Sequence, residues 1–265
     1  MDYTTILVDL DNHVATVTIN RPEAMNSFNK QMLEEFAYLW RWVAETDDVH
    51  VVVLRAAQGR AFSTGADVKA TEEPGGSLFH GNVWTDADPG EKLGPKAMKC
   101  WKPVVTAVHG MCAGGAFYWV GESDIVICSE DATFFDPHVT YGLTAALEPI
   151  HATYRMPLGD VLRMTLLGND ERITAYTALR LGLVTEVVPL EELWDRAQQL
   201  ATKIAAKPPA AIQGSTRAIW ESLDLPRSVA LATGLKYCQV GNPVSVPQVD
   251  RWALMGKGKT PYVLR

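Results

Sequence analysis

A buried strand that leads through a glycine turn into a helix is the feature that most constrains how this chain can fold. Residues 104–108, VVTAV, form the apolar, β-branched run typical of a strand covered on both faces. The turn after it contains Gly114 and Gly115, and the apolar segment that follows is long enough for a helix. The first N–H groups of a helix lack partners within it, and glycines let a ligand approach them. The stretch therefore predicts either an anion-binding turn or an ordinary glycine-rich turn.

Composition narrows the possible partners. The 265 residues carry a formal net charge of −7, which argues against nucleic acid or an anionic membrane as a partner, so an anionic ligand must be held locally. No apolar run reaches membrane-spanning length, and the first residues, MDY, open no signal peptide. The four cysteines show neither paired nor zinc-binding spacing, which predicts a reducing compartment, no metal and a cytoplasmic location.

The periodicity predicts a mixed α/β fold. Alternating residues favour a hairpin over 4–20, and a stripe of apolar residues predicts a helix over 29–46 with Asn29 as its N-cap. Further strands are predicted at 51–54, 124–128 and 184–189, an extended piece at 133–139, and helices over 149–183, 191–207 and the remaining C-terminal residues. The order strand, strand, helix recurs, which indicates coiled ββα units rather than strict βαβ units.

A second strand gives way to a glycine turn at residues 61–69. Asp67 follows Gly65 there and is expected to be an N-cap or a turn carboxylate. Residues 71–99, rich in proline, glycine and charge, are too long for a simple connector, so we interpret them as a segment covering the site.

Five short motifs, in order and in register, resemble the enoyl-CoA hydratase/isomerase (crotonase) superfamily. They are NRPEAMNS at 20–27, FSTGADVK at 62–69, KPVV with HGMCAGG at 102–115, Ser123-Asp124, and RITA with LGLV at 172–184. The match runs from about residue 4 to residue 200. It implies a crotonase-like spiral of ββα units over residues 1–200 and a helical trimerisation region over 201–265, hence a homotrimer or a dimer of trimers.

The resemblance also implies a substrate and a way of holding it. The amides of Ala66 and Gly115 would form an oxyanion hole for the thioester oxygen of an acyl-CoA, which is chemically sensible because a developing enolate needs preorganised donors. Groups around Ala24, Met25, Thr64 and Ala66 would hold coenzyme A. The basic residues near the C-terminus, Lys257 and Lys259, are further candidates for its phosphates or are simply a solvated tail. No separate cofactor is expected, since coenzyme A is part of the substrate.

The chain departs from the family at both positions where the hydratases carry a catalytic glutamate. Motif counting places Tyr118 and His138 there. In an extended segment, residues two apart share a face, so Asp136 is expected to orient His138 and raise its pKa. Tyr118 can donate to a substrate oxygen, and Glu148 can return to the same pocket. Each of the four side chains is a catalytic candidate with a structural alternative.

Three functions remain open from the sequence. The first is an acyl-CoA enzyme of the hydratase or isomerase type, including a C–C bond hydrolase. The second is a family member that binds acyl-CoA without catalysis. The third is an α/β-hydrolase with Cys112 as nucleophile and His138 or His151 as base, suggested by the G-x-C-x-G pattern at 110–114. We interpret Glu122 as a packing or subunit-contact residue and His109 and His151 as structural or pocket-lining residues. Four tryptophans are candidates for subunit contacts: Trp40, Trp42, Trp119 and Trp220.

Overall fold

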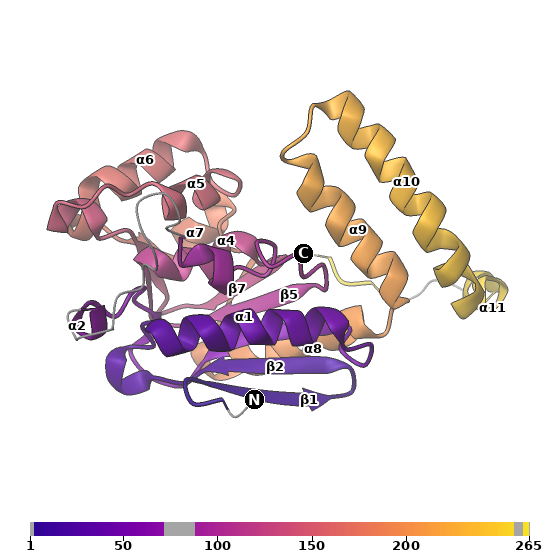
Figure 1. Ribbon diagram of the computed structural model, residues 1–265, viewed down its shortest axis with the longest axis horizontal. Coiled ribbons are helices and arrows are strands. Elements are labelled where there is room, and N and C mark those ends of the chain that lie inside the picture. The colour runs from indigo at the N-terminus through magenta and orange to yellow at the C-terminus, as the bar shows by residue number, and fades with distance from the viewer. Residues whose placement is uncertain (1–2, 72–87, 257–261, 265) are drawn as a thin grey trace. The chain divides into compact units, whose positions relative to one another are not determined.

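A computed structural model describes residues 3–71, 88–256 and 262–264 (Figure 1). Residue contacts divide the chain into two compact units, Met1–Ala205 and Ala206–Arg265. Each unit is considered by itself. The predicted boundary near residue 200 and the trimerisation role of the second unit stay predictions.

Two sheets form the first unit. The larger has the order β1-β2-β3-β5-β7-β10, antiparallel between β1 and β2 and parallel elsewhere. The smaller has the order β4-β6-β8-β9, with β9 antiparallel. The large-sheet strands are β1 (Ile6–Asp11), β2 (Val14–Ile19), β3 (Val51–Ala56), β5 (Val104–Val108), β7 (Ile125–Ser129) and β10 (Glu186–Val188). The small-sheet strands are β4 (Ala61–Ser63), β6 (Met111–Ala113), β8 (Thr133–Phe135) and β9 (Ile173–Thr174).

The chain alternates between the two sheets as it advances. Strand β3 is followed by β4, β5 by β6 and β7 by β8, so the chain passes three times from the large sheet to the small one. This is the coiled ββα arrangement that the sequence predicts. Because β4, β6 and β8 lie side by side, their carboxyl ends bring three separate turns to one edge of the small sheet.

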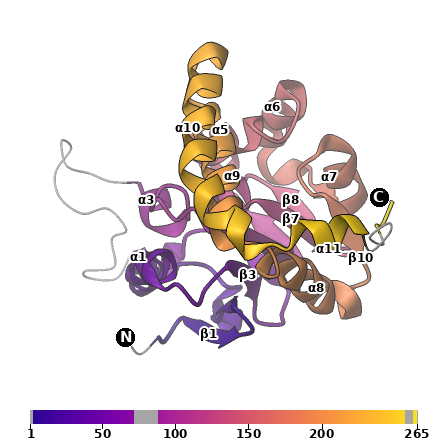
Figure 2. The same ribbon diagram turned by 90° about the vertical axis from the view of Figure 1, so that its right-hand side faces the viewer.

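Helices cover both faces of the large sheet (Figure 2). Helix α1 (Lys30–Glu45) starts at Asn29, whose side-chain oxygen accepts a hydrogen bond of 3.0 Å from the amide of Met32, as predicted. It buries an apolar stripe that includes Phe36 against one face. Helix α8 (Leu193–Ala205) packs its alanines on the other face, against β2, β3, β5 and β7. Both faces of the large sheet are thus covered by helices. The edge of the small sheet, where the three turns lie, is the part of the fold that can form a site.

Shorter helices surround that edge. They are α2 (Val68–Thr71), α3 (Gly90–Leu93), α4 (Phe117–Glu122), α5 (Leu147–Thr153), α6 (Leu158–Leu167) and α7 (Ala175–Leu181), with the 3-10 turns η1 (Pro22–Ala24), η2 (Gly114–Ala116), η3 (His138–Tyr141), η4 (Gly168–Asp170) and η5 (Leu190–Glu192). Helix α5 packs on α4, which follows the central glycine turn directly.

Two of the four tryptophans suggested for subunit contacts are unsuited to that role. Trp40 and Trp119 are fully buried within the first unit. The indole N–H of Trp40 donates a 2.8 Å hydrogen bond to the carbonyl of Leu93, and Trp119 packs between Phe36 and Phe62. The prediction was wrong for these two because a tryptophan signals large apolar area without saying whether the chain itself or a partner covers it.

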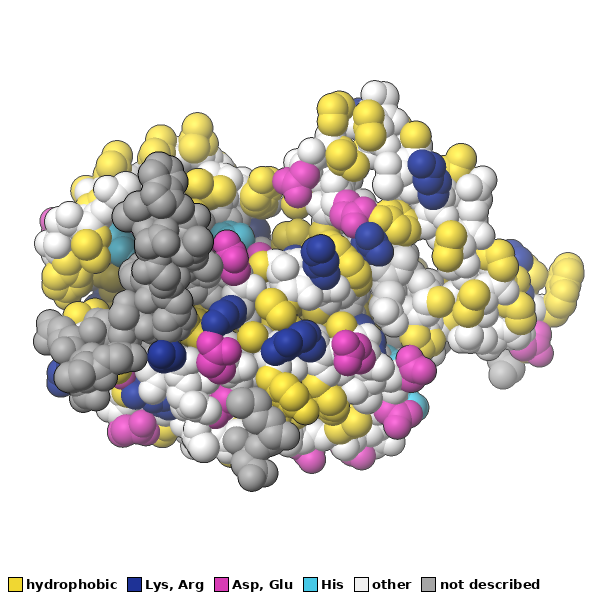
Figure 3. Space-filling model, in the orientation of Figure 1, with side chains coloured by type: hydrophobic (Ala, Val, Ile, Leu, Met, Phe, Trp, Pro, Cys, Tyr) yellow, Lys and Arg dark blue, Asp and Glu magenta, His cyan; other side chains and the backbone are white. Residues whose placement is uncertain are grey.

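The second unit is helical, as predicted. It contains α9 (Pro209–Ser222), α10 (Arg227–Ser245), η6 (Val246–Gln248) and α11 (Arg251–Gly256). Helices α9 and α10 pack against each other as a hairpin, and many of their apolar side chains, such as Leu231 and Leu235, are exposed (Figure 3). Lys257 and Lys259, the predicted phosphate ligands, lie outside the described residues. Among the described helices, none has the length and apolar character needed to cross a membrane.

Candidate active site

The two glycine turns that the sequence singles out meet in space. Gly65 follows β4 and has a φ of +81°, a left-handed conformation that suits glycine. A Cβ added to it would lie 2.7 Å from the nitrogen of Gly115 and 3.0 Å from the carbonyl oxygen of Ala113. Only a residue without a side chain allows the backbone of one turn to approach the other this closely. The close approach therefore places the peptide groups of Ala66 and Gly115 in neighbouring turns.

Both of these amides are uncommitted. Phe28 pairs with the peptide groups on either side of Ala66. The Phe28 amide donates to the carbonyl of Gly65 at 2.8 Å, and the Asp67 amide donates to the carbonyl of Phe28 at 2.9 Å. Across the described part of the chain, the amides of Ala66 and Gly115 have no hydrogen-bond acceptor. Gly115 stands in η2, just before α4, where first-turn donors are unpaired. The two donors are therefore available to an oxygen atom of a ligand.

A partly buried ion pair fixes the turn that holds Ala66. Arg21 Nη2 lies 2.8 Å from Asp67 Oδ2, and the other carboxylate oxygen of Asp67 accepts a 3.2 Å hydrogen bond from the amide of Ala70. Burial raises the pKa of Asp67, but the hydrogen bonds from Arg21 and from the amides of Ala70 and Lys69, together with the charge of Arg21, outweigh it and hold that pKa below its usual range. Asp67 is thus the turn carboxylate that the sequence predicts, and it positions the turn.

The residues expected around coenzyme A lie on adjoining segments. Met25 ends η1 with a left-handed φ of +52° and is exposed, and Ala24 and Thr64 are partly exposed. The buried side chain of Asn26 joins this turn to β4, because its amide nitrogen donates to the carbonyl of Ala61 at 2.8 Å. The roles of Ala24, Met25 and Thr64 toward coenzyme A stay predictions.

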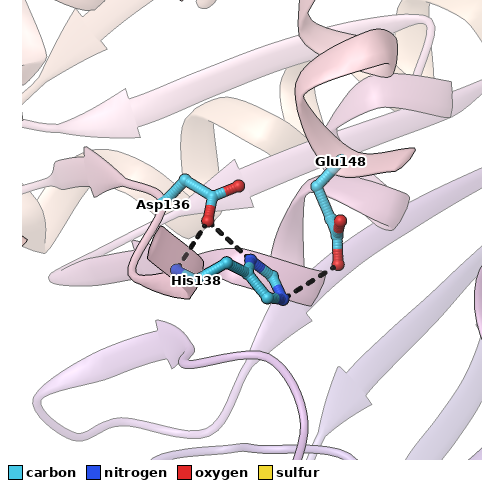
Figure 4. A group of neighbouring side chains, drawn as sticks. All are labelled: Asp136, His138 and Glu148. Carbon is cyan, nitrogen blue, oxygen red and sulfur yellow. Dashed lines mark hydrogen bonds and ion pairs between the residues drawn. The ribbon is translucent and has the colours of Figure 1, made fainter. Parts of the chain in front are cut away.

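Asp136, His138 and Glu148 form a continuous chain of side chains (Figure 4). Asp136 Oδ1 lies 2.6 Å from His138 Nδ1 and also accepts a 3.0 Å hydrogen bond from the amide of His138. On the opposite side of the ring, His138 Nε2 lies 3.7 Å from Glu148 Oε1. With Nδ1 donating to Asp136, Nε2 is left as a proton acceptor that faces Glu148.

The predicted contact exists, but the reason given for it was wrong. The extended segment ends at Phe135, and His138 begins η3, so alternation along a strand does not align the two side chains. Instead, the carboxylate of Asp136 caps the amide two residues later, in the manner of an Asx turn, and the imidazole folds onto the same oxygen atom.

The surroundings of His138 and Glu148 raise the pKa of both side chains. The hydrogen bond to Asp136 raises the pKa of His138 above its usual value, against the opposing effect of burial. Burial raises the pKa of Glu148, whose side chain is only 9% exposed. An imidazole and a carboxylic acid with pKa values closer to neutrality are suited to exchanging a proton with a substrate.

Tyr118 lies beside the turn that carries Gly115 and contacts Asp88, which was not among the predicted site residues. Its hydroxyl donates a 3.0 Å hydrogen bond to Asp88 Oδ2, and a Cβ added to Gly115 would lie 3.4 Å from its ring. Burial, with the nearby carboxylates of Glu148 and Asp88, raises the pKa of Tyr118 far above its ordinary value. Asp88 begins the segment DPG before α3, a helix-start signal that could have identified it as a cap but not as a partner of Tyr118.

The side chains and the glycine turns form one site. A Cβ added to Gly114 would lie 3.6 Å from Cε1 of His138, so the imidazole lies over the turn that carries Gly115. Tyr118 flanks the same turn, and its hydroxyl interacts with Glu148 as well as with Asp88. The structure therefore brings together Tyr118, Asp136, His138, Glu148 and the two amides.

The spacing of Asp136, His138 and Glu148 is better suited to sharing a proton than to binding a metal ion. One ligand atom from each of Asp136, His138 and Glu148 lies within 4.8 Å of the others, a grouping that could hold a cation. However, Asp136 Oδ1 and His138 Nδ1 are 2.6 Å apart, whereas two ligands at about 2.0–2.2 Å from one tetrahedral ion stand roughly 3.3 Å apart. That pair shares a hydrogen atom. The expectation that no metal takes part stays a prediction.

The side chains of Glu122 and His109 make no hydrogen bond with these described groups, whereas His151 lies beside Tyr118 and Asp88. Glu122 is buried and accepts hydrogen bonds from the amides of Lys96 and Ala97 at 2.6 and 2.9 Å, so it holds a loop within its own unit. His109 is buried, and His151 packs edge-on against Tyr118.

Cys112 is unsuited to nucleophilic catalysis. It lies within β6 rather than at the turn, it is fully buried, and burial raises the pKa of its thiol. Treating the native enzyme with an alkylating reagent should therefore leave Cys112 unmodified and activity intact, while the exposed Cys238 reacts. Peptide mass analysis with a parallel activity assay checks this, and loss of activity on labelling of Cys112 would contradict it.

The Asp136–His138 pair predicts a shift in the pH profile. A base must be neutral to act, so kcat/KM should fall as the pH drops through the raised pKa of His138. In Asp136→Asn the carboxylate is lost, the pKa of His138 falls, and the acid limb of the profile should move to lower pH with a lower plateau. Asp131→Asn removes an exposed carboxylate of the β7–β8 loop and should leave the limb in place. An unmoved limb in Asp136→Asn would assign the limb to another group.

The comparisons with known proteins agree with this geometry. The sequence profile described as enoyl-CoA hydratase/isomerase matches residues 9–239. The chain belongs to the enoyl-CoA hydratase/isomerase family. An enoyl-CoA hydratase/isomerase structure from Mycobacterium paratuberculosis superposes with a TM-score of 0.86 at 33% identity and covers 100% of both chains. The predicted crotonase-like α/β fold with its C-terminal helical region is confirmed.

Relatives within this family differ in their reactions. The chain is 34% identical over 223 residues to (E)-benzylidenesuccinyl-CoA hydratase of Thauera aromatica, covering 83% of this chain and 84% of the relative. It is also 34% identical over 227 residues, 84% of each chain, to (7aS)-7a-methyl-1,5-dioxo-2,3,5,6,7,7a-hexahydro-1H-indene-carboxyl-CoA hydrolase of Rhodococcus jostii. These enoyl-CoA hydratase/isomerase relatives support an enzyme acting on CoA thioesters, whereas the Cys-nucleophile hydrolase hypothesis has no support from the fold or the site.

Proposed function

We propose that this protein adds water across the C2–C3 double bond of a 2-enoyl-CoA thioester, with His138 and Glu148 in place of two glutamates. The observation that carries the proposal is the 3.7 Å separation of His138 Nε2 and Glu148 Oε1 above the glycine turn. This distance is too long for a direct hydrogen bond and suits one water molecule held by both groups.

The roles of the two groups follow from their proton states. His138 Nε2, oriented through Asp136, takes a proton from the water molecule as its oxygen bonds to C3. The electron pair of the double bond moves toward the thioester, whose oxygen accepts hydrogen bonds from the amides of Ala66 and Gly115. Glu148, protonated because burial raises its pKa, delivers its proton to C2. The proton on His138 then returns to Glu148, which restores the starting state.

The test is direct. The enzyme is incubated with short 2-enoyl-CoA thioesters, and the loss of the conjugated absorbance is followed while the 3-hydroxyacyl-CoA product is identified by mass. Saturable turnover supports hydration. Tight binding of several acyl-CoA thioesters without turnover would support the alternative of a catalytically silent acyl-CoA-binding protein.

A C–C bond hydrolase is the second candidate, favoured by the hydrolase relative in Rhodococcus jostii and by the imidazole–carboxylate pair. Here, the water molecule activated by His138 attacks a ketone at C3, and the C2–C3 bond breaks. The thioester enolate leaves into the same pair of amides and is protonated at C2. A 3-ketoacyl-CoA assay that detects a free carboxylic acid from the C3 side and a shortened acyl-CoA thioester from the C2 side would support this reaction over hydration.

A further inference from the structure

The proposed active site is lined with carboxylates. Asp88, Asp136 and Glu148 surround His138 and Tyr118. Asp136 and Glu148 both contact the imidazole of His138, and Glu148 also interacts with the Tyr118 hydroxyl. Asp88 accepts from the Tyr118 hydroxyl and from the amide of Gly90. The second imidazole beside this cluster, that of His151, has a pKa lowered by burial, which disfavours its positive form.

Basic side chains do not balance these charges. In the described ranges, no lysine or arginine forms an ion pair with Asp88, Asp136 or Glu148. Arg155, on the neighbouring α5–α6 connection, directs its guanidinium to the carbonyls of Gly121 and Ser123.

The side-chain hydrogen atoms nearest to Asp88 and Asp136 are already committed. The phenol proton of Tyr118 is donated to Asp88, and the Nδ1 proton of His138 to Asp136. The two free amides of Ala66 and Gly115 are taken by the thioester oxygen in the proposed function. A carboxylate on the acyl chain, a few bonds from a thioester held at Gly115, would therefore lie close to the carboxylate of Asp88 without a cationic partner.

We propose that the acyl group of the substrate is uncharged, and that the carboxylate of Asp88, beside Tyr118 and the Gly115 turn, excludes acyl-CoA thioesters with a second carboxylate near the reacting carbons. This inference rests on the proposed function, because it assumes that the acyl group passes the Gly115 turn. Like charges placed together in a partly buried site cost several kcal/mol, so discrimination on the order of 100-fold is expected. Selection of this kind works by repulsion rather than by an added attraction.

The experiment compares two substrates of equal carbon number. Pent-2-enoyl-CoA and glutaconyl-CoA differ in having a methyl group or a carboxylate at C5. We expect kcat/KM for pent-2-enoyl-CoA to exceed that for glutaconyl-CoA by about 100-fold. In Asp88→Asn this ratio should narrow severalfold, even if both rates change, because one repelling charge is gone. Asp195→Asn, an exposed carboxylate of α8, should leave the ratio unchanged.

A binding measurement separates this inference from the reaction. Calorimetric titration with pentanoyl-CoA and glutaryl-CoA, which contain no double bond, tests charge discrimination without catalysis. If pentanoyl-CoA binds more tightly than glutaryl-CoA but neither enoyl-CoA is hydrated, the inference of an uncharged acyl group is supported and the proposed hydration reaction is contradicted. Equal or better use of glutaconyl-CoA, or equal binding of glutaryl-CoA, overturns the inference. A substrate ratio that Asp88→Asn leaves unchanged also overturns it, because Asp88 is the proposed repelling charge.

Discussion

Replacing Gly65 with alanine should lower kcat by roughly 100- to 1,000-fold, the effect of losing one oxyanion donor. The added Cβ would lie 2.7 Å from the nitrogen of Gly115, one of the two proposed donors, and 3.0 Å from the carbonyl of Ala113. Both contacts are with backbone, so the turns must separate. Steady-state kinetics on the enoyl-CoA substrate, with circular dichroism to verify folding, measures the effect.

Gly142→Ala is the matched control for this variant. Gly142 has a similar left-handed φ of +74°, but a Cβ added to it meets no atom within 4 Å. It carries the conformational cost of alanine in this region, about 1–2 kcal/mol, without the collision. A thermal unfolding midpoint lowered in both variants, with activity lost only in Gly65→Ala, supports the oxyanion site. Full activity in Gly65→Ala would show that the two turns do not act together.

His138→Gln should lower kcat by about 100- to 10,000-fold, the range expected for removing a general base. Glutamine keeps the polarity and much of the length of histidine but cannot take up a proton near neutral pH. Because the ring lies over Gly114 and contacts Asp136, the loss should appear in kcat far more than in the binding of a saturated acyl-CoA.

A second histidine supplies the control. His50 is half-buried, and its Nδ1 interacts with the carbonyl of Ala205, so His50→Gln changes the same residue type outside the proposed site. We expect near-normal kcat for that variant. If His138→Gln keeps more than a third of the activity, another group must activate the water molecule, and Glu148→Gln is then the next variant to measure.

The parts of the fold that are coded locally were predictable. Asn29 caps α1 because its side chain reaches an amide three residues on, and the strand at 104–108 is β-branched throughout. The meeting of the turns at Gly65 and Gly115 is different, because 50 residues separate them. Only the resemblance to a family suggested it, and the contact between their backbones supports it.

The remaining features depend on packing that a local pattern does not encode. The contact between Asp136 and His138 was expected from a strand, but Pro137 ends the extended backbone and a turn creates the contact instead. The contact between Asp88 and Tyr118 was not predicted, because the two residues are 30 positions apart in the sequence. The burial of Trp119 likewise depends on aromatic residues from α1 and β4 that only the folded chain assembles.

The anchors on either side of residues 72–87 have a consequence for how this enzyme diversifies. The chain enters that stretch from a turn held by Arg21 and Asp67, and leaves it at Asp88, which is tied to Gly90 and Tyr118. With both ends attached to the rigid body of the unit, a change in loop length adds only about 0.6 kcal/mol per doubling. Exchanging this stretch for that of a homologue is therefore a practical way to test whether it sets acyl preference, because the reacting groups lie outside the exchanged residues.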